Sequence, residues 1–176
     1  YSSTQQPLDE DTPSGYFIPG FDGEWVATNP KNHIANISNA DSQQTGKLRR
    51  LIRLFKAWKY GSNVPITSYF LESFVFYIAQ EEKFSSNPHL DFFKILNCLN
   101  VHFNQQYVAI VDPNIYSDWG RIIPCAKEQF NQVKAHTERA AFMATSAMDA
   151  EWNGHIDTAT QYCHAIFGGD TRSYQS

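Results

Sequence analysis

Cysteine is scarce in this chain, and the spacing of the cysteines argues against a fold held together by a structural metal ion. The three cysteines, Cys98, Cys125 and Cys163, stand far apart, with neither a Cys-x-x-C pair nor a Cys/His spacing suited to zinc. An odd number of isolated cysteines is typical of a reducing compartment. We therefore expect a cytoplasmic protein whose cysteines are buried thiols.

Long apolar runs and excess positive charge are also missing. No apolar stretch is long enough to span a membrane, and no signal peptide is recognisable, so we expect no membrane partner. Only 18% of the residues are charged and the net charge is -4, which argues against bulk nucleic-acid binding through a basic surface. Any site for an anion must therefore be local.

Common catalytic motifs are absent as well. The chain has no glycine-rich loop of the P-loop or dinucleotide-binding type. Its six histidines lack a Cys or Ser partner in a nucleophile-type turn. Asp9-Glu10-Asp11 has the form of a magnesium-binding D-x-D pair, but it lies among Gln, Pro, Thr and Ser. Such ligands need a rigid strand, so an acidic solvated linker is the better interpretation.

Aromatic and aliphatic residues, in contrast, are plentiful. The chain is 42% apolar and 15% aromatic, with thirteen Phe, nine Tyr and four Trp, which is ample for a core. Its 176 residues suit one domain or one half of a larger enzyme. Because it starts at Tyr1 rather than Met, we expect a fragment, a processed chain or an expressed piece of a longer protein.

Apolar residues recur at helical spacing along most of the chain, and Gly and Pro residues separate these segments, which predicts a mainly α fold. Residues 1–15 read as a polar linker or mobile loop, Tyr16–Pro19 as a short edge strand, and residues 21–30 as loop with Trp25 as an anchor. About five helices should follow, as a bundle with one or two short amino-terminal strands. The expected helices cover Thr45–Tyr60, Thr67–Gln80, a segment from Pro88, a long segment from Pro124, and Ile156–Phe167.

A basic stripe on the first of these helices is the best candidate for chemistry. Leu48, Leu51, Ile52 and Phe55 form its apolar face, and Lys56 lies beside that face with Arg53 one turn earlier. Such a row could meet a triphosphate through charge-assisted hydrogen bonds. A solvated basic face is the alternative, and spacing alone favours it.

The second candidate is the pair Ser68-Tyr69 at the start of the following helix. Exposed N–H groups and the helix dipole favour an anion there, Ser68 adds a hydroxyl, and Tyr69 could stack on a base. A serine cap beside a core tyrosine remains the alternative.

The order of segments resembles the second half of the cGAS/DncV-like nucleotidyltransferases (CD-NTases), which are relatives of oligoadenylate synthase. The resemblance covers nearly all of the chain from Tyr16 onward, and its closing helices match that family's final pair up to a Phe-Gly. It is carried by the segments Tyr16–Pro19, Trp25–His33, Arg50–Trp58, Ser68–Glu72 and Ala144–Gly168.

This resemblance implies that residues 16–176 are the helical nucleotide-binding lobe of a bilobed enzyme. In that family, a lysine on the first long helix contacts phosphates, and a Ser-Tyr pair contacts phosphate and stacks on the donor base. Those roles would fall on Lys56, Ser68 and Tyr69, with Arg53 as an auxiliary contact. The parent would join ATP or other NTPs into cyclic oligonucleotide messengers in antiphage defence.

The family's catalytic wall is not in this sequence. Its Gly-Ser loop and acidic metal ligands, which hold Mg²⁺ in the amino-terminal lobe, have no counterpart here, so we expect no catalytic residue and no metal site in this chain and no activity of the chain alone. Its partners would be NTPs, that amino-terminal lobe and a regulatory protein. Two alternatives stay open: the lobe of a template-independent RNA or tRNA nucleotidyltransferase, and a non-enzymatic helical interaction module.

Overall fold

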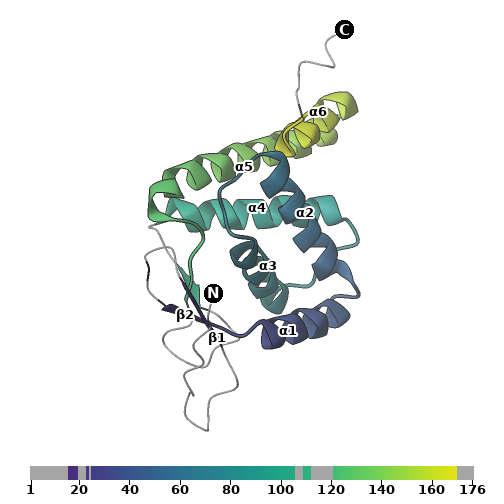
Figure 1. Cartoon of the computed structure of the whole chain (residues 1–176). Coiled ribbons are helices and arrows are strands. Elements are labelled where there is room, and N and C mark those ends of the chain that lie inside the picture. The colour runs from purple at the N-terminus through teal and green to yellow at the C-terminus, as the bar shows by residue number, and fades with distance from the viewer. Residues whose placement is uncertain (1–15, 20–22, 24, 106–108, 112–120, 170–176) are drawn as a thin grey trace.

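A computed structural model describes residues 16–19, 23, 25–105, 109–111 and 121–169 of the chain (Figure 1). The expected linker over residues 1–15 lies outside the described residues. The described part is mainly helical with a short antiparallel sheet near its amino end, which confirms the expected fold class. Its α-helices are α1 (Pro30–Gln43), α2 (Lys47–Gly61), α3 (Ser68–Glu81), α4 (Pro88–Asn104), α5 (Phe130–Trp152) and α6 (Ile156–Ile166).

Two small antiparallel sheets accompany the helices. In the first, β1 (Tyr16–Pro19) pairs with β2 (Trp25–Thr28), with Tyr16 opposite Thr28. In the second, β3 (Ile110–Val111) pairs with β4 (Arg121–Ile122). The expectation of a loop over residues 21–30 was therefore wrong for β2. Trp25 is no anchor either, because it is 62% exposed.

Helix α1 is the one that the sequence interpretation missed. Asn29 and Pro30 fall at the end of the expected loop, yet the Asn29 side chain accepts a hydrogen bond from the Asn32 N–H at 3.1 Å, and Pro30 occupies the first helical turn. Asparagine as a cap followed by proline suits a helix start as well as a turn. Only His33, Ile37 and Ala40 of this helix are buried, so its apolar stripe is narrow.

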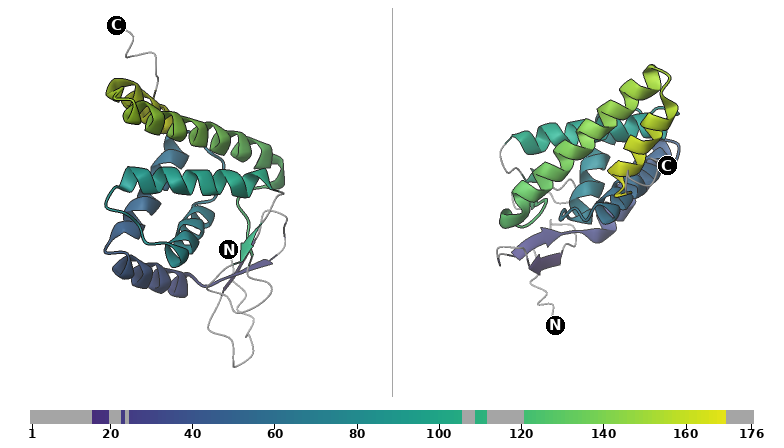
Figure 2. Two further views of the ribbon diagram at one scale, coloured as in Figure 1. Left: turned by 180° about the vertical axis from the view of Figure 1, so that it is seen from behind. Right: turned by 90° about the horizontal axis from the view of Figure 1, so that it is seen from above.

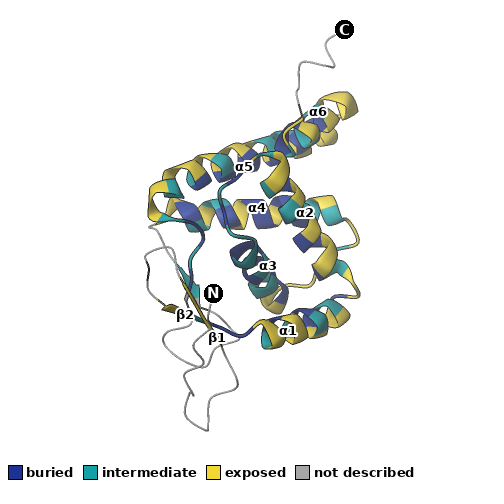
Figure 3. Ribbon diagram, in the orientation of Figure 1, coloured by how far each residue is buried: buried dark blue, intermediate teal, exposed yellow. Residues whose placement is uncertain are grey.

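The core is built on α2, α3 and α4. The predicted stripe of α2 is buried as expected, and Trp58 extends it. The aromatic side chains of the core contact one another; Phe55 lies 4.7 Å from Phe92 between ring centroids, and Phe70 lies 5.8 Å from Phe103. Figure 3 shows the buried faces of these helices turned inward, with exposed residues on their outer sides.

Helices α5 and α6 form a pair across one side of the molecule, beside α4 (Figures 1 and 2). The β1–β2 hairpin lies at the opposite end from α6. Helix α5 starts at Phe130 after a short 3₁₀ turn, η1 (Lys127–Gln129), and not near Pro124 as the sequence suggested. The Pro124 carbonyl instead accepts a hydrogen bond from the Thr67 N–H at 2.7 Å, which fastens this segment to the start of α3.

None of the helices in the described ranges combines the length and the apolar character that a membrane crossing requires.

Candidate functional site

The carboxylate of Glu72 joins three helices at one place. Its Oε1 lies 2.6 Å from Lys56 Nζ on α2, and its Oε2 lies 3.2 Å from His33 Nε2 on α1. Glu72 itself is on the second turn of α3. Both carboxylate oxygens are therefore engaged, and the ammonium group of Lys56 is held in a fixed direction with two of its three N–H donors still available.

A second cross-helix contact lies one turn away. Lys59 Nζ donates a hydrogen bond to Ser68 Oγ at 3.0 Å, and the same ammonium lies 5.0 Å from the centroid of the Tyr60 ring. Lys59 follows Lys56 by three residues, while Ser68 precedes Glu72 by four, so the two contacts run in opposite directions along α2 and α3. Two lysines and one serine hydroxyl thus face the same seam between these helices.

Tyr69 lies next to this seam. Its ring centroid is 4.6 Å from that of His33, at an angle of 54°, and the residue is partly buried against the core. The start of α3 is capped by Thr67, whose side chain accepts from the Phe70 N–H at 3.2 Å. Thr67, and not Ser68, is therefore the cap. The Ser68 hydroxyl is left to the lysine on α2.

The electrostatics of the seam favour an ionised glutamate. Burial raises the pKa of Glu72, but the hydrogen bonds and positive charges of His33 and Lys56 outweigh it, so the pKa lies below its ordinary value. The Glu72 side chain is 22% exposed and that of Lys56 is 37% exposed, so solvent screens the pair in part. The site carries two ammonium groups against one carboxylate.

Arg53, the arginine that was predicted as an auxiliary contact, is not part of this cluster. Arg53 is exposed on α2 and, within the described part of the chain, makes no hydrogen bond or ion pair. Arg49, one turn earlier, donates from Nη2 to Ser38 Oγ at 2.7 Å and lies 3.9 Å from Asp41, so it is directed toward α1. The basic stripe of α2 therefore splits, and only Lys56 with Lys59 faces α3.

The described residues do not fit a magnesium site. They contain no group of three or more His, Cys, Asp or Glu side chains able to hold a metal ion. Glu72 is the one carboxylate in contact with Lys56, and both of its oxygens are already taken. Two-metal phosphoryl-transfer sites need several carboxylates around the ions.

Sequence reasoning missed three members of the cluster: His33, Lys59 and Glu72. Glu72 is the single charged residue between Tyr69 and Ala79, and it follows Ser68 by one helical turn, so its position on the face of Ser68 was readable. Lys59 repeats the spacing of Arg53 and Lys56. No sequence signal marks His33, because its contact with Glu72 spans 39 residues and depends on how α1 packs.

Comparison of the chain with models of known protein families, with curated proteins and with solved structures gave no match.

Proposed function

We propose that this chain is the nucleotide-binding helical half of a nucleotidyltransferase of the cGAS/DncV-like kind, which makes cyclic oligonucleotide second messengers from NTPs in antiphage defence. One observation carries the proposal: Lys56 and Lys59 on α2 meet Glu72 and Ser68 on α3 across one seam, with Tyr69 beside it. The segment order described above supplies the family and the kind of product.

The two lysines would bind the phosphates. Each ammonium has three N–H donors and spends one on a contact within the chain, so two remain on each for phosphate oxygens. The negative charge of Glu72 offsets part of the attraction between the two ammonium groups and a phosphate. The bound ligand would therefore be released readily. Ser68 Oγ accepts from Lys59 and keeps its own O–H to donate to a phosphate oxygen.

Tyr69 would hold the base. The ring contacts that of His33, and the residue is partly exposed. Stacking of a base on an aromatic side chain contributes about 1–3 kcal/mol and tolerates different bases. Arg53 lies one turn from Lys56 and, with its guanidinium exposed, would reach only the outer phosphate.

Calorimetric titration of the 176-residue chain with ATP tests this assignment. We expect saturable binding that weakens by about tenfold in both Lys59→Gln and Tyr69→Leu, because each removes one charge-assisted or stacking contact. Arg50→Gln is the matched control, since Arg50 is an exposed cation of the same helix, and it should leave the affinity unchanged. Incubated with ATP and Mg²⁺, the chain alone should yield no cyclic product.

Two results would contradict the proposal. One is the absence of any heat of binding when ATP is added at millimolar concentration. The other is an equal loss in Lys59→Gln and Arg50→Gln, which would mean that ATP responds only to the overall charge. Affinity for an RNA end in place of free ATP would instead support the template-independent polymerase lobe.

A second candidate, a protein-interaction module, is favoured by one feature of α5. Phe142 and Trp152 are 68% and 90% exposed, so two large aromatic side chains of this helix are available to a partner protein. In this case, ATP would not bind, and replacing these two side chains by Ser would change the association of the chain while Lys59→Gln would not.

A further inference from the structure

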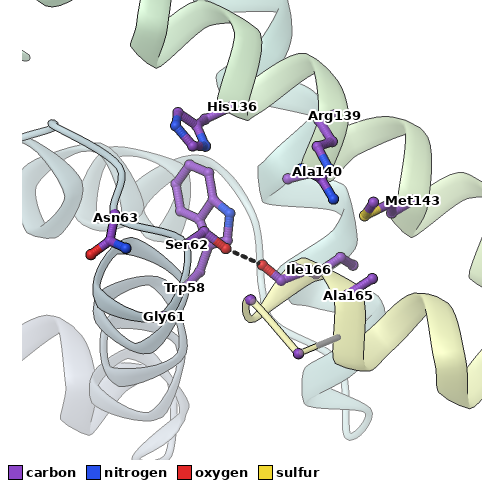
Figure 4. A pocket seen from close by; sticks show the side chains of 12 residues that line it. Trp58, Gly61, Ser62, Asn63, His136, Arg139, Ala140, Met143, Ala165 and Ile166 are labelled. Atoms are coloured by element: carbon purple, nitrogen blue, oxygen red, sulfur yellow. Dashed lines mark hydrogen bonds between the residues drawn. The ribbon is translucent and has the colours of Figure 1, made fainter. Parts of the chain in front are cut away.

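A cavity of about 250 Å³ opens where the end of α2 meets α5 and α6 (Figure 4). It is separate from the seam that holds Lys56 and Glu72, because its lining comes from other residues. The lining includes Trp58, Asn63, His136, Arg139, Met143 and Ile166. Among the lining residues that the structure describes, none is Asp or Glu.

Hydrogen-bond donors reach this cavity from α2 and α5. Arg139 and His136 lie on successive positions of one face of α5, and within the described ranges neither has a hydrogen-bond or ion-pair partner. Burial, and secondarily the charge of Arg139, lower the pKa of His136, so a neutral imidazole stands beside the Arg139 guanidinium. Asn63 adds a side-chain amide from the other side (Figure 4).

The indole N–H of Trp58 is a further donor at this cavity. The residue is 1% exposed, yet its indole N–H finds no acceptor in the described part of the chain. The indole nitrogen is also not among the fully enclosed, unsatisfied polar atoms, a class that holds only Ser73 Oγ in these ranges. It therefore opens into the cavity that Trp58 lines, and Figure 4 shows it on the side of the ring turned toward Arg139. A buried donor without an acceptor is costly, and a bound acceptor would satisfy it.

The walls of the cavity are fixed. Ser62 Oγ donates to the Ile166 carbonyl at 2.7 Å, so the segment after α2 is fastened to the end of α6 (Figure 4). Ala140, Met143 and Ile166 provide an apolar side that could receive carbon atoms of a ligand. Pockets that combine such a side with a few converging polar groups are typical of small-molecule sites, usually of about 300–1,000 Å³. This one is smaller, so its ligand is small.

We propose that this cavity binds a small phosphate monoester, with the phosphate group against Arg139, His136 and the Trp58 indole N–H. A guanidinium group pairs two oxygens of a phosphate at once, and a third oxygen remains for the indole. A carboxylate presents its two oxygens in one plane, so the tetrahedral oxygens of a phosphate match donors from three sides better. The described lining offers a guanidinium group and no carboxylate, which favours an anionic ligand over a cationic one.

Nuclear magnetic resonance of the indole N–H groups tests the proposal directly. The Trp58 signal is identified as the one lost in Trp58→Phe. Titration with inorganic phosphate or glycerol 3-phosphate should shift it saturably, while an equal ionic strength of chloride should not. Arg139→Gln should weaken binding by about tenfold or more, because a bidentate charged contact is lost. Arg50→Gln, with the same charge change on the outer face of α2, should bind as the original chain does.

The two probes separate the possible sources of the ligand. Glycerol 3-phosphate should bind more tightly than inorganic phosphate, because Ala140 and Met143 receive its carbon atoms; equal affinity would overturn the assignment to an ester. An unchanged affinity in Arg139→Gln, with an unchanged circular dichroism spectrum and thermal midpoint, would overturn the site. Weaker phosphate binding in Lys59→Gln would also overturn the site, because it would place the phosphate at the α2–α3 seam. The calorimetric test of ATP binding at the seam would be unaffected by that outcome.

Discussion

At the scale of single residues, Glu72 organises the α2–α3 seam. The sequence predicted Lys56 from its place on the basic stripe of α2, and Ser68 and Tyr69 from their position at the start of α3, with their roles taken from the resemblance. Their partners were not predicted. Whether a glutamate on α3 meets a lysine on α2 or a histidine on α1 depends on the angles at which the three helices pack, and local periodicity carries no information on those angles.

Glu72→Gln should lower stability at neutral pH by about 1 kcal/mol, because a partly exposed ion pair contributes little more than this. The pKa of Glu72 is lower in the folded chain than its ordinary value of 4.5. The carboxylate therefore stabilises the fold above pH 4.5, and its contribution is lost as the pH falls through the lower folded pKa. Urea denaturation should thus show a smaller difference between the two chains at pH 3 than at pH 7.

The control is Glu138→Gln. Glu138 is 48% exposed and lies 3.9 Å from Lys134 within one helix, so its removal should change stability by only a few tenths of a kcal/mol at either pH. A stability loss in Glu72→Gln that stays the same at pH 3 would show that shape, and not charge, is what Glu72 provides.

At the scale of elements, a buried glutamine fixes how α1, α2 and α3 are joined. Gln44, directly after α1, donates from Nε2 to the carbonyls of Ala79 and Glu82, each at 2.8 Å, and its Oε1 accepts from the Phe84 N–H at 3.0 Å. Both ends of α2, α3 and α6 were predicted within a few residues, and α4 was predicted from its start at Pro88. This connection was not, because a glutamine between two helices has no periodicity of its own.

Gln44→Met should destabilise the chain by about 2–4 kcal/mol, since it leaves three backbone groups near the end of α3 without their partner. The neighbouring Gln43 is exposed, so Gln43→Met provides a matched control with an expected change within about 0.5 kcal/mol. Urea denaturation measures both. Equal midpoints for the two variants would mean that water replaces the Gln44 side chain without cost.

At the scale of the whole molecule, the end of α6 closes against the end of α2. A β-carbon at Gly168 would fall on the carbonyl oxygen of Gly61, and one at Gly61 would fall on the carbonyl oxygen of Phe167. Phe167 also stacks on Phe92 at 5.4 Å between centroids. Gly61 is the last residue of α2, and its role is this close approach to a segment more than 100 residues away, which no local rule could reveal.

Gly168→Ala should therefore cost about 2–5 kcal/mol of stability, as the sum of left-handed backbone strain and overpacking. Gly154→Ala separates the two effects. Gly154 has φ 78°, close to the 81° of Gly168, but nothing lies within 4 Å of an added β-carbon, so only the strain of about 1–2 kcal/mol applies. Thermal denaturation compares the pair. Equal losses would show that the two segments separate easily.

The two lysine contacts across the α2–α3 seam have a consequence for how much affinity a ligand could gain there. A lysine side chain carries about 2 kcal/mol of rotamer entropy, which is lost when it is immobilised. Lys56 and Lys59 are held by Glu72 and Ser68 without any ligand, so much of that loss occurs when the chain folds. An incoming phosphate would meet two preorganised ammonium groups, and the entropy of ordering them would not be subtracted from its binding free energy.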